Sequence, residues 1–418
     1  MALNKRAPKS AFVKSMATLV SGSVLAQAIT IVVSPITTRL FTPSELGVYT
    51  LVVSSVTMFG AVLSLRYDMA IVYEEKEGNV FPLVALSAAL DIVVSLIVAI
   101  GYYCYFQFFS SSGYPPLLAA AFTFVQCALF GLVNVLNSYN NRKRQYRLMS
   151  SANAERAIVQ NAGIVGSGLL GLGATGLIAA QSLGYIIGVR KQTAGLAGET
   201  DEFRRISRRE VIHVARLHRK QALWSAPAAF ANGFAYSVIN YFIEFLYSSA
   251  TVGYYSLSYR MLGLPTNIVA TNISRVFAER ATHDKQTIGN FRRIYRKTLI
   301  MMVGMSIPIG IILMAFAPQL FAFVFGPSWE IAGEYVRILT PMFVLRFIAG
   351  GLNSSAMIAN KQQWDLVVQA LLVFGVLLSF GASLALALPV EGMLKIINIV
   401  SSAVYVYYIF VFWHCAKC

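Results

Sequence analysis

Charged side chains inside apolar segments are the residues of this chain most able to do chemistry. Placing one at the centre of a membrane helix costs about 2.5–3.5 kcal/mol, so each is expected to face a cavity or a partner. Arginine offers a planar fork of N–H donors that holds phosphate through two bonds. The seven candidates are Arg66, Asp68, Asp91, Glu244, Arg260, Arg337 and Arg346. Because arginines dominate, the set predicts a site for an anionic ligand.

The three acids among these candidates allow two interpretations. Asp91 and Glu244 can bind a coupling proton or sodium ion, and they can equally form salt bridges with the arginines. Asp68 follows Arg66 by two residues, a spacing that aligns the two side chains poorly on a helix. Either of these two residues can therefore bridge to another helix. Arg337 lies near an outer rim, which makes it the weakest of the four arginine candidates.

The remaining residues do not suggest a catalytic or metal centre. The inner loops contain no paired-aspartate cluster beyond Asp201-Glu202, and the histidines at 213, 218 and 283 lie among basic residues, as loop side chains do. Cys415 and Cys418 are spaced as a Cys-x-x-Cys pair in the C-terminal tail but lack a second ligand pair. We expect no catalytic residues, no metal and no enzyme, with an integral-membrane enzyme as the competing class.

The composition places these charges in an all-α polytopic membrane protein. Of the 418 residues, 57% are hydrophobic and only 12% are charged, more apolar than a soluble domain. Apolar stretches of about 20 residues recur, each long enough to cross a hydrocarbon core of about 30 Å. Twelve spans are predicted, at residues 12–36, 48–72, 80–103, 115–139, 152–171, 174–190, 221–246, 252–276, 298–325, 332–357, 364–387 and 392–413.

The distribution of Lys and Arg predicts the orientation of these spans. The net charge of +16 would suggest nucleic-acid binding in a soluble protein. Most basic residues, however, fall at the N-terminus or in the loops after even-numbered spans, while loops after odd-numbered spans are nearly free of them, Arg39 excepted. Because basic loops stay on the cytoplasmic side, both termini are predicted to be cytoplasmic. Nucleic acid is not an expected partner.

A basic segment at residues 199–220 separates two halves of the chain. It places Phe203, Val214 and Leu217 at helical spacing among arginines, which fits either an interfacial helix on an anionic leaflet or a solvated linker. We expect an N-terminal six-helix lobe at residues 1–198 and a C-terminal six-helix lobe at residues 221–418.

A short internal repeat supports this division. The segment Leu40–Leu51 is similar to Leu246–Leu257, and the two occur at the first-to-second and seventh-to-eighth span junctions. An even number of spans in each half makes the halves parallel repeats, related by an axis along the membrane normal. The sequence therefore predicts two parallel lobes around a central cavity.

Short motifs recur in a fixed order almost from end to end of the chain. They are Gln27–Pro35, Arg39, Thr42-Pro43, Gly47, Leu65–Val72, Asn141–Lys143, Gly173–Gly184, Ser225–Pro227, Gly253–Pro265, Val276-Phe277, Phe325–Trp329, Ala332-Gly333, Tyr335 and Arg337–Pro341. In order and spacing these motifs resemble those of the polysaccharide repeat-unit flippases of the Wzx type, within the multidrug/oligosaccharidyl-lipid/polysaccharide exporter superfamily. In that family an acidic residue follows an Arg-Tyr pair; here it is Asp68, where Glu is commoner.

The resemblance implies a transporter of a bacterial inner membrane. Its expected cargo is an undecaprenyl-pyrophosphate-linked oligosaccharide moved between leaflets for O-antigen, lipopolysaccharide, exopolysaccharide or capsule synthesis. Its expected partners are this lipid-linked substrate, membrane lipids and the polysaccharide polymerase and chain-length machinery. A lipid II flippase and a cation-coupled multidrug exporter share the predicted plan, and an integral-membrane polysaccharide polymerase or glycosyltransferase is the less favoured alternative. No cofactor is expected beyond a coupling H⁺ or Na⁺.

Three arginines can form a path for the pyrophosphate. At a rise of about 1.5 Å per residue, Arg66 lies about 8 Å from the inner end of its predicted span, Arg346 about 20 Å below the outer end and Arg260 about 12 Å below it. The hypothesis is that the pyrophosphate passes from Arg66 past Arg346 to Arg260 as the lobes rock.

Overall fold

The fold consists of helices throughout the part of the chain that the structure describes. The computed structural model describes residues 9–110, 112–196, 198–199, 202–203, 206–359, 361 and 363–417, without the side chains at 9–21, 23, 228, 232, 235, 236, 267 and 366. No strand occurs among these residues. Asp201 and Cys418, named above, lie outside them.

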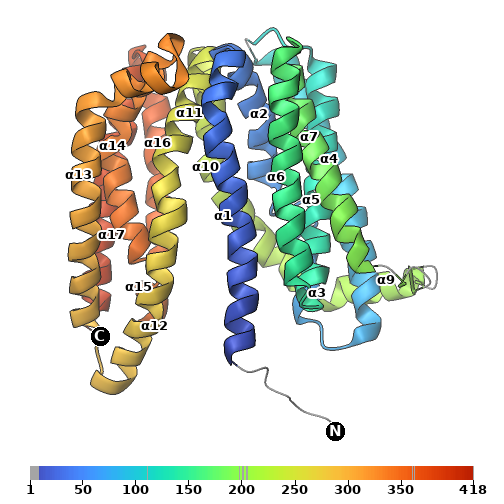
Figure 1. Ribbon diagram of the computed structural model, residues 1–418. Coiled ribbons are helices and arrows are strands. Elements are labelled where there is room, and N and C mark those ends of the chain that lie inside the picture. Colours follow the sequence, from blue (N-terminus) through green and yellow to red (C-terminus); the bar gives the residue numbers. More distant parts are fainter. Residues whose placement is uncertain are drawn as a thin grey trace. The chain divides into compact units, whose positions relative to one another are not determined.

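The chain divides into two compact units, Met1–Tyr241 and Phe242–Cys418. The first unit is coloured blue to green in Figure 1. Its α-helices are α1(Lys9–Leu40), α2(Pro43–Phe59), α3(Tyr67–Tyr73), α4(Val80–Phe108), α5(Pro116–Arg142), α6(Tyr146–Leu169), α7(Gly173–Thr193), α9(Arg208–Leu217) and most of α10(Ala226–Leu246). It also contains the short 3-10 turns η1(Glu77–Asn79) and η2(Ala194–Leu196) and the π-helical turn η3(Gln221–Ser225). In this unit α6 packs against both α1 and α7, and α4 packs against α5.

The second unit, coloured yellow to red in Figure 1, is built around α14. It contains α11(Ser249–Pro265), the π-helical turn η4(Thr266–Ala270), α12(Thr271–Ile288), α13(Arg292–Phe325), η5(Pro327–Trp329), α14(Glu330–Gly351), α15(Ser355–Ile358), α16(Gln363–Leu386) and α17(Val390–Cys415). Helix α14 contacts α11, α13 and α17, so it forms the interior of the unit.

Each of the twelve predicted spans overlaps a helix of the structure. Among the described residues, six helical stretches are long and apolar enough to cross a membrane: Glu77–Phe108, Pro116–Arg142, Arg292–Phe325, Pro327–Ile358, Gln363–Leu386 and Val390–Cys415. The chain is therefore a multi-pass membrane protein. The arrangement as twelve spans with cytoplasmic termini stays a prediction, as do the lobe boundaries at 198 and 221.

The prediction of one continuous helix over residues 48–72 is wrong, because α2 ends at Phe59 and α3 begins at Tyr67. Between them the backbone makes tight turns that end with Leu65 at φ 48° and Arg66 at φ 66°. A side chain strains the backbone in this left-handed region, and such strain persists only where surrounding packing imposes it. The Gly60 carbonyl, which lies beyond the end of α2, accepts a hydrogen bond from the side-chain amide of Asn134 at 3.5 Å. The break removes the basis for the depth assigned to Arg66.

The internal repeat marks two equivalent helix starts. Helix α2 begins after Thr42, whose hydroxyl accepts the Glu45 N–H at 3.3 Å, while the Glu45 carboxylate accepts the Thr42 N–H at 2.8 Å. Helix α11 begins after Ser248, whose hydroxyl accepts the Thr251 N–H at 3.2 Å. The two N-caps stand 248 − 42 = 206 residues apart, the offset of the repeat. The shared residues thus perform one local task, satisfying N–H groups at a helix start.

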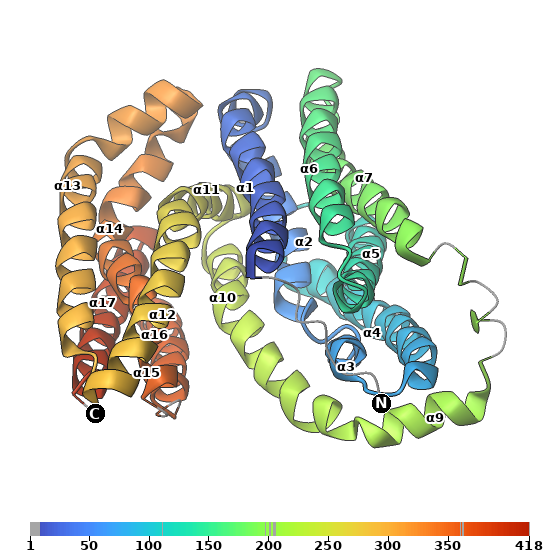
Figure 2. The same ribbon diagram turned by 60° about the horizontal axis from the view of Figure 1, so that its bottom comes forward.

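Helix α9, within the basic segment, packs against unit 1. It runs across the ends of α3 and α4 (Figure 2). Val214 is fully buried in a cluster with Tyr67, Leu83 and Tyr139. The Tyr67 hydroxyl also donates to the Ala215 carbonyl at 2.9 Å. Val214 is therefore covered by protein, whereas Leu217, another apolar residue of the predicted pattern, is 54% exposed. Whether the helix also faces a leaflet stays a prediction.

A side-chain contact between His218 and Glu74 fixes the C-terminal end of α9. Nε2 of His218 lies 2.6 Å from a carboxylate oxygen of Glu74, whose side chain is only 5% exposed. Burial by itself would raise the pKa of the Glu74 carboxyl group. Hydrogen bonds from the Lys76 N–H, His218 and Asn79 outweigh burial, so the pKa of Glu74 is lowered overall. His218, interpreted from sequence as a loop side chain, instead joins the linker to the first unit.

Candidate functional site

Arg346 lies among aromatic side chains within the second unit. Its guanidinium donates a hydrogen bond to the Tyr259 hydroxyl and lies 5.4 Å from the centroids of both the Tyr259 and Phe343 rings. The two rings meet edge to face at 5.1 Å. Helices α11 and α14 supply these groups. An arginine placed beside two rings and bonded to a hydroxyl keeps its charge while its orientation is restricted, which suits recognition of an anionic group. Sequence reasoning named Arg346 but not Tyr259.

The other charged candidates of the second unit occupy different environments. Arg260 follows Tyr259 on α11, and its side chain is exposed. Glu244, on α10, is fully buried. Arg337 pairs with Glu334 at 2.6 Å, and both side chains are substantially exposed. Arg337 therefore behaves as a surface ion pair, as its position near the rim suggested.

Arg66 stands at the helix break of the first unit. It is the residue before α3, its side chain is half-buried, and its Nε atom is buried with no hydrogen-bond partner among the described residues. The strained backbone directs a cation to a position that a regular helix would not provide. Arg66 belongs to the first unit, whereas Arg260 and Arg346 belong to the second, so the path from Arg66 to Arg260 stays a prediction.

The two acids of the first unit are both buried. Asp68 accepts a hydrogen bond from the Ser64 hydroxyl at 2.8 Å. Asp91 is fully buried on α4, where one carboxyl oxygen accepts from Ser95 at 3.4 Å and the other has no partner among the described residues. A Cβ atom on Gly131 of α5 would lie 1.8 Å from Asp91 Oδ1, so only glycine leaves room for this carboxyl group.

Arg156 is a cation within a predicted span that the sequence analysis did not name as a candidate. It lies on α6 with its guanidinium 4.7 Å from the centroid of the Tyr185 ring on α7. Beside it, Gln181 accepts hydrogen bonds from Gln160 and from the Tyr49 hydroxyl at 3.0 Å, and its amide donates to Tyr185 at 3.0 Å. Three helices, α2, α6 and α7, thus supply one polar network.

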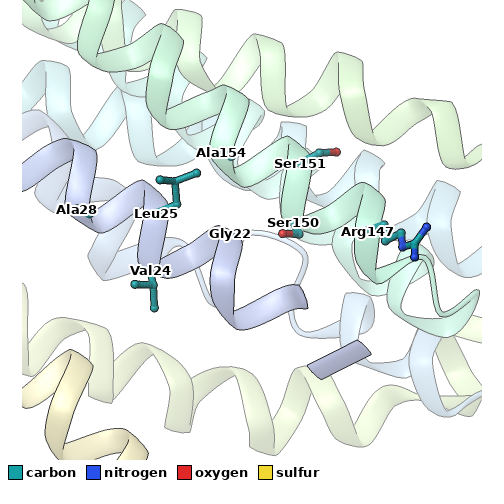
Figure 3. A pocket seen from close by; sticks show the side chains of 8 residues that line it. All are labelled: Gly22, Val24, Leu25, Ala28, Arg147, Ser150, Ser151 and Ala154. Atoms are coloured by element: carbon teal, nitrogen blue, oxygen red, sulfur yellow. The ribbon is translucent and has the colours of Figure 1, made fainter. Parts of the chain in front are cut away.

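A cleft of about 580 Å³ opens between α1 and α6, as Figure 3 shows. One end presents the exposed Arg147 with Ser150 and Ser151, and the other is lined by apolar side chains including Val24 and Leu25. Cation and hydroxyl groups at one end and hydrocarbon at the other suit an amphiphilic ligand with a negative head.

Metal ligands do not gather in the described part of the chain, where no group of three or more His, Cys, Asp or Glu residues could hold an ion. Cys415, the first cysteine of the Cys-x-x-Cys spacing in the C-terminal tail, is buried within the second unit.

Solved structures similar to this chain are membrane transporters. The inward closed conformation of the lipid II flippase MurJ matches with a TM-score of 0.73 and 14% identity, covering 93% of this chain and 87% of that chain. An inward-facing multidrug resistance MATE family transporter of the MOP superfamily matches with a TM-score of 0.65 and 13% identity, covering 94% and 98%. A MOP superfamily transporter from Pyrococcus furiosus matches with a TM-score of 0.61 and 15% identity, covering 97% and 96%.

At these identities the similarity establishes the fold alone. No curated protein sequence matches the chain. The sequence profile described as "Polysaccharide biosynthesis protein" matches residues 36–334, which include the strained turn at Arg66, the Arg156 network and the start of α14. Because this match covers well over half of the sequence, the chain belongs to the polysaccharide biosynthesis protein family.

Proposed function

We propose that this protein is a flippase for undecaprenyl-pyrophosphate-linked oligosaccharide repeat units. It moves them from the cytoplasmic to the periplasmic leaflet of a bacterial inner membrane by alternating access, for O-antigen, lipopolysaccharide, exopolysaccharide or capsule synthesis. The family supplies the link to polysaccharide synthesis, and the transporter fold supplies the link to translocation. Its partners would be the polymerase and chain-length machinery that consume the translocated units.

The observation that carries this proposal is the arginine of the second unit held by aromatic rings. A pyrophosphate needs a fixed cation, and sugar rings pack on aromatic faces. Arg346 and the half-buried Tyr259 offer both within one site, and the buried Phe343 supports the guanidinium. A cationic drug would be repelled by a guanidinium in this position, which disfavours a multidrug exporter. The α1–α6 cleft is consistent with a lipid-bearing ligand.

A lipid II flippase is the second candidate. The fold match with MurJ favours it, and a pyrophosphate-linked lipid would meet the same cations. The match to a polysaccharide biosynthesis family favours the repeat-unit cargo over lipid II. An integral-membrane polymerase or glycosyltransferase would need acid or base groups at an aqueous face, and the contacts described above supply cations and rings instead.

Asp91 is the acid best placed to couple transport to H⁺ or Na⁺. A fully buried carboxylate with an unpartnered oxygen is costly, so the group holds a proton or a cation during part of the cycle. Glu244 and Asp68 are alternative coupling acids or partners of the arginines. Arg66, Arg346 and Arg260 remain the proposed pyrophosphate path. Arg337 is not part of it, because it pairs with Glu334 and both side chains are exposed.

The test is transfer of a labelled undecaprenyl-pyrophosphate oligosaccharide between leaflets of proteoliposomes. Arg346→Gln and Arg260→Gln should each slow transfer at least about tenfold, because a lost charge-assisted phosphate contact is worth about 1.5–3 kcal/mol. Arg337→Gln is the matched control and should change the rate less than about twofold. Absence of transfer by wild type under H⁺ and Na⁺ gradients, combined with export of a cationic dye, would reject the proposal in favour of a drug exporter.

A further inference from the structure

Arg156 is a cation inside a predicted membrane span. It lies on α6, four residues after the start of the span predicted at 152–171, so about 6 Å along the helix axis. A charged side chain within a span is expected to meet a counter-charge, to line a polar cavity or to extend toward the interface.

The described residues supply no counter-charge to Arg156. Its neighbour Glu155 pairs with Lys191 at 2.8 Å. Arg156 itself has the ring contact with Tyr185, and no hydrogen bond or carboxylate reaches its guanidinium among these residues. Five N–H donors on a half-buried fork are thus available for a ligand.

A glycine lets α6 and α7 approach closely beside Arg156. A Cβ atom built on Gly184 of α7 would lie 2.9 Å from the Cβ of Gln160 and 3.2 Å from the backbone carbonyl oxygen of Arg156, so a larger residue would push the two helices apart. A Cβ atom on Gly188 would make only an ordinary contact, 3.5 Å, with Cδ of Arg156. The close approach brings the guanidinium over the ring of Tyr185, which is only 4% exposed.

Amide and hydroxyl groups lie beside the guanidinium. Gln181, itself 6% exposed, is held by Tyr49, Gln160 and Tyr185, so its position is fixed before any ligand arrives. Gln160 is half-buried and, like Arg156, projects from α6. Side-chain amides pair with sugar hydroxyls as donor and acceptor together, and a tyrosine ring presents an apolar face.

We propose that Arg156, Tyr185 and Gln160 form a binding site of the first unit for a phosphate or pyrophosphate group together with the sugar attached to it. This inference deepens and rests on the proposed function, and it adds an anion site to the arginines of the second unit. Arg156 holds the phosphate oxygens, Tyr185 orients the guanidinium from below, and Gln160 contacts a hydroxyl of the first sugar.

The test measures binding of two fluorescent short-chain polyprenyl pyrophosphate probes, one carrying a disaccharide and one without sugar, to the purified full chain in detergent. Arg156→Gln should weaken both probes about tenfold or more, and Arg156→Lys about threefold, because lysine keeps the charge but loses the fork. Gln160→Met should weaken only the sugar-bearing probe. Lys191→Gln removes a charge that joins the same two helices and should change neither affinity by more than about twofold.

The outcomes separate this site from the proposed function. Unchanged binding by folded Arg156→Gln, or equal loss in Lys191→Gln, would overturn the site. If Arg156→Gln does not fold, unchanged binding by Arg156→Lys together with unchanged sugar preference in Gln160→Met would overturn it as well. Binding that depends on Arg156 in a wild-type protein that transfers no lipid-linked sugar in liposomes would uphold the anion site and reject the flippase. Displacement of both probes by equimolar phosphatidylglycerol would assign the site to a membrane phospholipid and overturn the cargo.

Discussion

Replacing Val214 with alanine tests whether α9 is held by protein contacts. The Val214 side chain is fully buried, with 0% of its surface exposed, in the cluster that includes Tyr67 and Leu83. The substitution removes two methyl groups, each worth about 0.8 kcal/mol, and leaves a small cavity, so docking of α9 should weaken by about 2 kcal/mol. That corresponds to about a 30-fold larger population of the undocked helix.

Hydrogen exchange of the α9 amides measures this population. A ten-residue helix is marginal in isolation, so undocking exposes its N–H groups to solvent. Exchange in α9 should therefore accelerate about 30-fold in Val214→Ala, while the helices of the second unit stay unchanged. Ile212→Ala is the matched control, because Ile212 lies on the same helix and is 43% exposed. Equal acceleration in both variants, or none in Val214→Ala, would refute the docked arrangement and favour a helix whose apolar side enters the leaflet.

Three further predictions concern single groups. The lowered pKa of Glu74 means that its contribution to docking is complete above its ordinary pKa of 4.5 and is lost as pH falls through the lowered pKa, so α9 exchange should accelerate as the pH falls below 4.5. Gly131→Leu should destabilise the protein by more than about 2 kcal/mol, seen as a lower melting temperature in detergent, because the new side chain collides with Asp91. Tyr259→Phe should slow transport less than Arg346→Gln, since the ring remains and only the hydroxyl contact is lost.

Each of these predictions has a control. Glu74→Gln should remove the acid dependence of α9 exchange, and a persistent acid transition would assign it to another group. Gly101→Leu, on α4 where nothing lies within 4 Å of an added Cβ, should leave the melting temperature nearly unchanged, and an equal loss would contradict the collision at Asp91. Equal transport defects in the Tyr259 and Arg346 variants would place the essential contact at the hydroxyl group.

The sequence allowed the helices to be located, because a long apolar run has few alternatives to a helix in lipid. It did not reveal the break before α3. The two residues with positive φ, Leu65 and Arg66, are neither glycine, which usually occupies such a conformation, nor proline, which usually interrupts a helix. The break depends on tertiary contacts, such as the hydrogen bond that the Asn134 side-chain amide donates to the Gly60 carbonyl. Contacts between residues so far apart in the sequence leave no local signal.

Arg156 was missed for a different reason. The candidates were charges deep inside apolar runs, and Arg156 lies only four residues after the start of the span predicted at 152–171. Its contact with the Tyr185 ring joins two different helices and has no local sequence signal. The pairing of Glu74 with His218 also escaped prediction, because 144 residues separate the two and neither stands in a periodic pattern.

Glycines stand beside two of the unusual polar positions of the first unit. Gly131 leaves the space that Asp91 fills, and Gly184 lets α7 approach the backbone of α6 at Arg156 and Gln160. In lipid, where helices gain little from apolar contact with one another, small residues set how closely backbones approach and which polar groups fit between them. By this reasoning, Gly131 keeps a space for a buried acid, and Gly184 fixes the distance between the two helices that hold the Arg156 network.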